Sequence, residues 1–367
     1  MSSAIPIFKL HYSESDRTFL KEGLEKILDE AYLTNHTHVR SFEEKFSRWN
    51  SSSYAVAVSN GTTAIEAALR AIDVRGKEVI IPANTFIACA DAVLNAGATP
   101  VLCDIEPDYL SLDPVRVEEK INAKTGAVMV VHIGGLISPE VLKLKKICED
   151  HRVPLLEDCA HAHGASYKGI KAGNIGSAGA FSFHMTKVMT TGEGGMVVTN
   201  DSVLLSELQS VRQFGKSEKN PIMHVRDGSN FKMTEMQALM GLLELKRVES
   251  RVLKRQQIAA VYEEKLKGSA WKTWSAAPDA ECPYYKKIVL PPVSRKKVEE
   301  VFAKHEIALT GGVYYIPVHQ QEVFRGTKEE FKNTDEFCNR HICPPCYPEL
   351  EISEAEKIAD VMLEIAR

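Results

Sequence analysis

The segment AGAFSFHMTKVMTTGEGGMVVT, residues 178–199, contains two apolar runs with a lysine and a glycine-rich turn between them. The runs, Ala178–His184 and Met196–Thr199, are short and apolar at most positions. Strands that are apolar on both sides are typical of a sheet that helices cover on both faces. The segment therefore predicts two buried strands and places Lys187 in the connection between them.

Five upstream segments share this strand-like character: Tyr54–Ser59, Glu78–Pro82, Pro100–Ile105, Ala127–His132 and Val153–Glu157. Helical segments lie between them: Thr62–Ala71, Phe86–Ala96, Pro114–Asn122 and Pro139–Asp150. This alternation predicts an α/β fold with a large, doubly wound and mostly parallel sheet. Right-handed crossovers then bring the loops that follow the strands to one edge of the sheet, where ligands bind.

The pattern changes after Thr199. A long helix is expected over Thr234–Leu266, followed by a strand at Tyr285–Leu290 and helices at Arg295–His305 and Ser353–Ile365. A chain of 367 residues exceeds the usual size of one hydrophobic core. We therefore predict a large α/β domain over residues 1–250 and a smaller C-terminal α+β domain over residues 251–367.

Charge and composition limit the classes of partner. The formal net charge is −4 and no polybasic stretch is present, so neither nucleic acid nor an anionic membrane is an expected partner. The N-terminus does not resemble a signal peptide, and the apolar segment 127–137 is too short to span a bilayer. The sequence predicts a cytoplasmic protein whose partners are small molecules or a second copy of the chain.

The eight cysteines are too sparse for a disulfide framework. Cys343 and Cys346 form a single C-x-x-C motif without the second pair of a zinc site. Cys159, His161 and His163 alternate near the end of a predicted strand, again without further ligands. No metal is expected at either group.

Two polar elements follow predicted strands. Ser59-Asn-Gly-Thr-Thr-Ala64 opens a helix, where backbone N–H groups and the hydroxyls of Thr62 and Thr63 could hold a phosphate. An ordinary strand-to-helix turn with a cap is the alternative. The run Val153–His161 ends its apolar part in Glu157 and Asp158. A buried carboxylate needs a cation or donors, such as a protonated pyridine nitrogen, although it could instead cap the following segment.

Lys187 is the third polar element. A free lysine amine in such a turn could attack a carbonyl carbon, whereas a single lysine is more often an ordinary surface residue. A phosphate loop, a buried acid and a lysine on one sheet match what pyridoxal 5′-phosphate requires, which is one contact each for its phosphate, ring nitrogen and aldehyde. The combination favours a binding site for this cofactor.

The chain resembles the DegT/DnrJ/EryC1/StrS family of sugar aminotransferases, which have the type I fold of pyridoxal-phosphate enzymes. The similarity extends from about residue 39 to residue 350. The segments that carry it are SNGTTAIEAAL, KEVIIPANTFIA, GATPVLCDIEPD, LLEDCAHAHGASYKG, GAFSFHMTKVMTTGEGGMVVT and GSNFKMTEMQALMG. This resemblance implies an aminotransferase that depends on pyridoxal phosphate.

The resemblance also implies roles for individual residues. Lys187 would form a Schiff base with the cofactor and later move a proton, and Asp158 would pair with the pyridinium nitrogen. His161 would lie near the ring oxygen and Phe86 against the ring. Phosphate contacts are implied for the hydroxyls of Thr62, Thr63 and Ser182. Asn230 would reach the phosphate of the neighbouring subunit, which implies a homodimer with shared sites.

Departures from the family pattern concern the substrate. Lys232 replaces an arginine, His132–Gly135 lacks the usual aromatic residue, and Asn35–Val39 lacks a glycine. His319 matches a segment that can contact substrate. The TTGEGGM segment is more similar to enzymes that act on 4-keto-6-deoxy sugar nucleotides than to those that act on 3-keto sugars.

The expected reaction is therefore transfer of an amino group from glutamate or glutamine to a keto-sugar nucleotide. Alternatives are a 3-keto sugar, a non-nucleotide ketone such as an inosose or a small keto-phosphate, and a non-catalytic cofactor-binding regulator. Relatives that dehydrate the sugar lack the lysine, so Lys187 argues against them. No DNA-binding module flanks the predicted domains, which disfavours the regulator.

Overall fold

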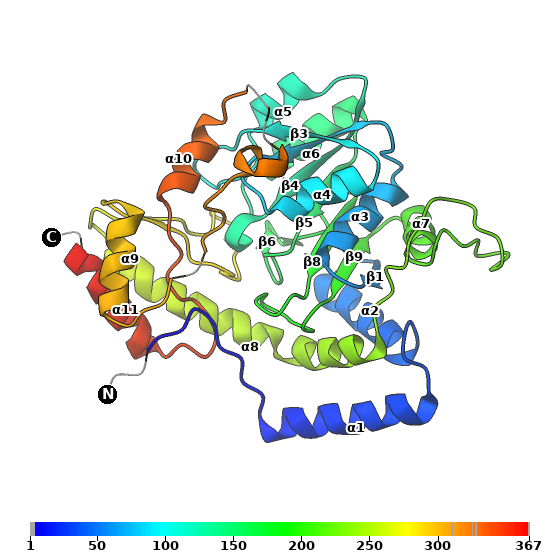
Figure 1. Ribbon diagram of the computed structural model, residues 1–367, viewed down its shortest axis with the longest axis horizontal. Coiled ribbons are helices and arrows are strands. Elements are labelled where there is room, and N and C mark those ends of the chain that lie inside the picture. The colour runs from blue at the N-terminus through cyan, green and yellow to red at the C-terminus, as the bar shows by residue number, and fades with distance from the viewer. Residues whose placement is uncertain (1–3, 310, 325, 327–328, 366–367) are drawn as a thin grey trace.

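Figure 1 shows a computed structural model of the chain, which describes residues 4–309, 311–324, 326 and 329–365. Its centre is a seven-stranded sheet in the order β1-β9-β8-β5-β4-β2-β3. The strands are β1 (Tyr54–Val58), β2 (Glu78–Pro82), β3 (Thr99–Cys103), β4 (Thr125–Val131), β5 (Leu155–Asp158), β8 (Ala178–Ser182) and β9 (Gly195–Thr199). Only β9 runs antiparallel to its neighbours. The predicted strands and the mostly parallel sheet are confirmed.

Helices cover both faces of the sheet. Along β4, Ala127 and Met129 pack into one hydrophobic cluster, while Val128 and Val130 pack into another on the opposite face. The first cluster includes residues of α3 (Gly61–Ala71), α4 (Ile87–Asn95) and α7 (Ser202–Arg212). The second includes residues of α2 (Thr37–Asn50), α5 (Pro114–Lys120) and α6 (Val141–His151). This alternation explains why the strands read as apolar throughout.

The longest helix, α8 (Glu235–Leu266), crosses beneath the sheet in Figure 1. It begins at a capping box between Thr234 and Gln237. It packs against α2, α1 (Glu14–Glu30) and α11 (Ile352–Ile365). The proposed domain boundary near residue 250 falls inside this continuous helix, so α8 belongs to both parts of any two-domain division. No described helix has the length and apolar character that crossing a bilayer requires.

Short elements make up the rest of the chain. The strands are β6 (Ser166–Tyr167), β7 (Ile170–Lys171), β10 (Lys272–Thr273), β11 (Ala280–Glu281) and β12 (Val289–Leu290), and the helices are α9 (Arg295–Lys304), η2 (Val318–Gln320), η3 (Glu322–Phe324), α10 (Lys332–Arg340) and, between β4 and α6, η1 (Ile133–Gly135). The predicted strand at Tyr285–Leu290 is wrong over its first four residues. At the first of these residues, the Tyr285 carbonyl accepts from the Arg255 guanidinium.

Candidate active site

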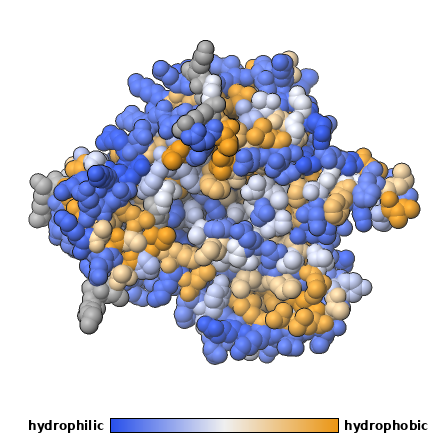
Figure 2. Space-filling view, viewed as in Figure 1, coloured by the Kyte–Doolittle hydropathy of each residue, from blue (hydrophilic) through white to orange (hydrophobic). Residues whose placement is uncertain are grey.

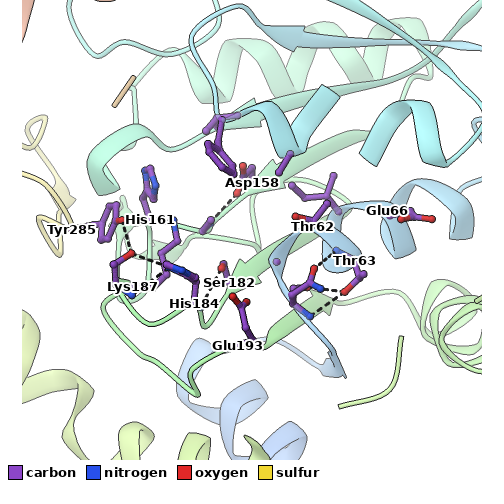
Figure 3. A pocket seen from close by; sticks show the side chains of 18 of the residues that line it. Thr62, Thr63, Glu66, Asp158, His161, Ser182, His184, Lys187, Glu193 and Tyr285 are labelled. Atoms are coloured by element: carbon purple, nitrogen blue, oxygen red, sulfur yellow. Dashed lines mark hydrogen bonds between the residues drawn. The ribbon is translucent and has the colours of Figure 1, made fainter. Parts of the chain in front are cut away.

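A cavity of about 590 Å³ opens at the edge where the parallel strands end. This is the edge at which the fold class places ligands. Figure 3 shows side chains from several strand ends and from the start of α3 turned toward this space. Seven of the predicted site residues line it: Thr62, Thr63, Phe86, Asp158, His161, Ser182 and Lys187.

The start of α3 forms one wall of the cavity. Asn60 caps the helix by accepting a hydrogen bond from the Thr63 N–H at 2.9 Å, and the Thr63 hydroxyl bonds the Asn60 backbone in return. A Cβ at Gly61 would lie 2.5 Å from the Cβ of Ser182, so only glycine lets β8 approach so closely. First-turn N–H groups lack partners within the helix and attract anions. Together with the hydroxyls of Thr62 and Ser182, they can hold a phosphate.

Asp158 forms the floor of the cavity at the end of β5, where it is 6 % exposed. One carboxylate oxygen accepts from the Ala160 N–H at 2.9 Å, and the other accepts from the Cys89 thiol at 3.1 Å. Within the described ranges, no lysine, arginine or histidine forms an ion pair with it. A buried carboxylate without a cation is unfavourable, so this position suits a positively charged group of a ligand.

Glu157 precedes Asp158 but faces the other side of the sheet. Its two oxygens accept from the N–H groups of Gly173, Ile175 and Gly176 and bond to His132 Nε2, all at 2.7–2.9 Å. These four contacts satisfy the carboxylate within the fold. Glu157 is therefore held by the fold itself, whereas its neighbour Asp158 faces the cavity.

Lys187 lies in the turn after β8, with its Nζ 4.7 Å from the centroid of the Tyr285 ring. Its amine forms no ion pair with any residue that the structure describes. Burial would raise the pKa of Tyr285, but the Lys187 and Lys286 ammonium groups and a hydrogen bond with Thr186 outweigh burial and leave the pKa below its usual value. The Tyr285 hydroxyl, Thr186 Oγ1 and His184 Nδ1 are linked at 3.1 and 3.0 Å (Figure 3). Sequence reasoning missed Tyr285.

His161 and Tyr314 form the opposite wall. Nδ1 of His161 accepts from the Gly134 N–H at 3.2 Å, and its Nε2 lies 3.1 Å from the Tyr314 hydroxyl. Burial, followed by the charge of Lys187, holds the pKa of His161 well below its ordinary value, so the ring is neutral. Neutral imidazole with an acceptor at Nδ1 carries its proton on Nε2, and His161 therefore donates to Tyr314. Phe86 lines the cavity and is 54 % exposed, and its ring centroid lies 5.5 Å from that of Tyr314.

Three predicted residues lie outside this cavity. Asn230 and Lys232 bond to each other on the segment between α7 and α8. His319 bonds Asp335 at 3.0 Å and packs on Phe331. None of the three contributes to the cavity of its own chain.

Cys159, His161 and His163, which lie close together in the sequence, do not form one group in the fold. His161 faces the cavity, whereas His163 packs against Phe181 and Phe183 on the opposite side of the sheet. Cys159 instead lies with His132 and Glu157, whose potential ligand atoms fall within 4.8 Å of one another. Glu157 already has four partners there. All eight cysteines are free and buried, including Cys343 and Cys346.

A lysine, a carboxylate and an anion-binding helix start around one cavity of this α/β fold are typical of fold type I aminotransferases. The chain belongs to the DegT/DnrJ/EryC1/StrS aminotransferase family, whose family model matches residues 14–363. This family depends on pyridoxal phosphate. The predictions of family, fold class and aminotransferase activity are confirmed.

Individual relatives support this assignment. The chain is 38% identical to the GDP-perosamine synthase of Caulobacter vibrioides over 226 residues, which is 61% of each chain. It is 29% identical to the GDP-perosamine synthase of Escherichia coli O157:H7 over 98% of each chain. The crystal structure of S. venezuelae DesV superposes with a TM-score of 0.93 at 29% identity, covering 100% of this chain and 99% of that one.

Proposed function

We propose that this aminotransferase binds pyridoxal phosphate in the cavity and transfers an amino group from glutamate or glutamine to a keto-sugar nucleotide. The observation that carries the proposal is a pair of groups on one cavity: among the residues that the structure describes, Asp158 has no cationic partner and Lys187 has no anionic partner. Asp158 is buried, and a buried charge is costly unless a counter-charge or donors satisfy it.

The residues present fit the cofactor at each of its polar groups. The start of α3, with Thr62 and Ser182, would hold the phosphate, and Asp158 would hold the protonated ring nitrogen. Phe86 and His161 flank the space between them. When bound, pyridoxal phosphate supplies an aldehyde that condenses with amines and a ring that withdraws electrons.

Lys187 is the proposed catalytic base. Its amine would hold the cofactor before the reaction and, once released, would carry a proton between the reacting carbon atoms. The ring of Tyr285 lies against this amine and limits where it can move. His161 is neutral and donates to Tyr314, so it adds no positive charge beside the cofactor site.

The proposed acceptor is a 4-keto-6-deoxy sugar nucleotide. Two relatives are named GDP-perosamine synthase, and this name, which denotes an enzyme of nucleotide sugars, supports a nucleotide sugar as the acceptor. Glu193 and His184 also line the cavity but have no assigned contact with the cofactor. Their polar groups are therefore available to a sugar. The choice of a 4-keto over a 3-keto sugar rests on the TTGEGGM segment alone.

Replacing Lys187 tests the cofactor assignment. Lys187→Ala should abolish both the visible absorbance band of lysine-bound pyridoxal phosphate and the formation of amino sugar. Lys286→Ala is the matched control, because Lys286 also lies near the Tyr285 ring, at 5.2 Å, but does not line the cavity. Persistence of the band in Lys187→Ala would contradict the assignment.

The acceptor is tested separately. Purified protein with pyridoxamine phosphate would be incubated with 4-keto and 3-keto sugar nucleotides and an inosose, and mass spectrometry would detect the amino product. Product from the 4-keto sugar nucleotide alone is the expected result. Product only from the inosose would replace the sugar nucleotide with a non-nucleotide ketone.

We also propose a homodimer in which Asn230 and Lys232 reach the cavity of the neighbouring subunit. The segment that carries them extends from the body of the molecule near α7 (Figure 1) and exposes Ile222, which is 86 % accessible, and Met223. Figure 2 shows a second apolar patch over α1, at the lower right. Leu24 and Leu28 are exposed apolar side chains of α1. Exposed apolar groups of this kind are typical of interfaces.

Mixed dimers test the shared site. Lys187→Ala and Asn230→Ala chains would each be poorly active alone, but a mixture that exchanges subunits should regain activity. One site of each mixed dimer then combines an intact Lys187 with an intact Asn230 from the other chain. No recovery in a mixture shown to contain mixed dimers would place Asn230 outside the neighbour's site.

A further inference from the structure

Behind the cavity floor, three buried side chains form a hydrogen-bonded row. The Thr85 hydroxyl lies 3.0 Å from Cys89 Sγ, which lies 3.1 Å from Oδ2 of Asp158. Thr85 is 2 % exposed and Cys89 is fully buried. Thr85 lies just before α4 and Cys89 lies in its first turn, whereas Asp158 is the last residue of β5. The row therefore joins two different elements.

The chemistry of the groups fixes the direction of each hydrogen bond. An ionised carboxylate only accepts, so the thiol donates to Asp158. The thiol has a single proton, and the Thr85 hydroxyl must therefore donate to the sulfur. Burial, followed by the charge of Asp158, raises the pKa of Cys89 well above its ordinary value, which keeps the thiol protonated and able to donate.

The carboxylate consequently has one donor on each oxygen, the Ala160 N–H on Oδ1 and the Cys89 thiol on Oδ2. Two donors from separate elements fix its plane. A thiol is a weak donor, so it orients the carboxylate while withdrawing little of its negative charge. The charge remains available to a cation in the cavity. Cys89 itself does not line the cavity, and any effect on a ligand must pass through Asp158.

We propose that Cys89 is a positioning residue of the cofactor site, which holds the Asp158 carboxylate in the orientation that receives a protonated ring nitrogen, with Thr85 supporting the thiol. This inference rests on the proposed function, because it assumes that pyridoxal phosphate is the ligand. It adds a residue whose role is to orient the acid and not to touch the cofactor.

Four variants test the proposal. Cys89→Ala removes the donor, Cys89→Ser keeps a donor at nearly the same place, and Thr85→Val removes the hydroxyl behind the thiol. Cys148→Ala is the matched control, since Cys148 is equally buried but lies on α6, away from the cavity. Each protein is loaded with pyridoxal phosphate labelled with ¹⁵N in the ring. The ¹⁵N chemical shift then reports ring protonation, and dilution reports cofactor release.

Cys89→Ala should alter the ring ¹⁵N shift and release the cofactor about tenfold faster, as loss of a hydrogen bond to a charged group implies. Thr85→Val should change both readouts in the same direction by a smaller factor, about twofold. Cys89→Ser should restore retention, and Cys148→Ala should match the wild type. If Cys89→Ala does not fold, Thr85→Val and Cys89→Ser carry the same test.

Two negative results are distinguishable. Wild-type ¹⁵N shifts and release rates in Cys89→Ala and Thr85→Val would overturn the positioning role and leave the proposed function intact. A wild-type protein that binds no pyridoxal phosphate would overturn the proposed function, and the role of Cys89 with it. Equal losses of thermal stability in Cys89→Ala and Cys148→Ala with a ¹⁵N change only in the former would support the proposal.

Discussion

Glu157 and Asp158 are consecutive acids at the end of β5, but they face different environments. Among the described residues, Glu157 has four donors and Asp158 has two, one of them a thiol. Because strand residues alternate between faces, a single step along β5 separates an acid whose partners lie within the fold from the acid that we propose binds the cofactor. The number of donors around a buried acid is therefore a better guide to function than its burial.

Replacing Asp158 by asparagine should give the largest effect in this comparison. The change keeps the shape and removes the charge, so the cofactor ring would no longer be held protonated. We expect activity to fall by about 10³-fold, which is roughly 4 kcal/mol of activation free energy. The folded state should be nearly as stable as in the wild type. Steady-state kinetics and thermal unfolding would measure the two quantities.

Replacing Glu157 by glutamine is the matched change on the other face. An amide NH₂ would then face backbone N–H groups that now donate to a carboxylate oxygen. Unsatisfied buried donors should lower the free energy of unfolding by about 2–3 kcal/mol. Activity per folded molecule should change little. If this variant keeps its stability but loses activity as Asp158→Asn does, the division between the two acids is wrong.

For each histidine and each pH unit, acid should produce a smaller effect, which also involves both faces. Burial lowers the pKa of His163 and His341 to about 3 and that of His161 well below its ordinary value. The unfolded chain takes up protons at these histidines below pH ~6.5, whereas the folded protein does not. Stability of the cofactor-free protein should therefore fall as pH drops, by up to about 1.4 kcal/mol per pH unit for each histidine.

His163→Leu sharpens this last prediction. His163 packs against Phe181 and Phe183, so a leucine keeps apolar contacts and removes one titrating group. Chemical denaturation between pH 7 and pH 5 should show a shallower loss of stability than in the wild type. An unchanged slope would mean that His163 becomes protonated without unfolding.

The sheet could be predicted because its strands are buried on both faces and read as short apolar runs. The helices α1 and α2 were not predicted. In α1, Leu20, Leu24 and Leu28 recur at helical spacing and a capping box lies at Ser13, so local signals for this helix were available. In α2, Val39, Phe42 and Phe46 do follow helical spacing. The prediction of α2 could have been made from this spacing alone.

The site residues that could be predicted all follow strands of the sheet, where chain order fixes position. Tyr285 and Tyr314 were not predicted as site residues, because they lie in irregular segments far along the chain that have no periodic pattern. Tyr314 meets His161 across 153 residues of sequence. Such contacts depend on how the C-terminal part folds back over the sheet. Cys89 reads as an ordinary apolar residue of α4, and only its hydrogen bonds distinguish it.

The close approach of Gly61 to Ser182 divides the cavity into a part that resists change and a part that accepts it. Any side chain at position 61 would push α3 away from β8. Glu193 and His184 instead line the cavity without a part in the proposed cofactor contacts. Engineering a new acceptor specificity should therefore vary these positions and leave the glycine at position 61 unchanged.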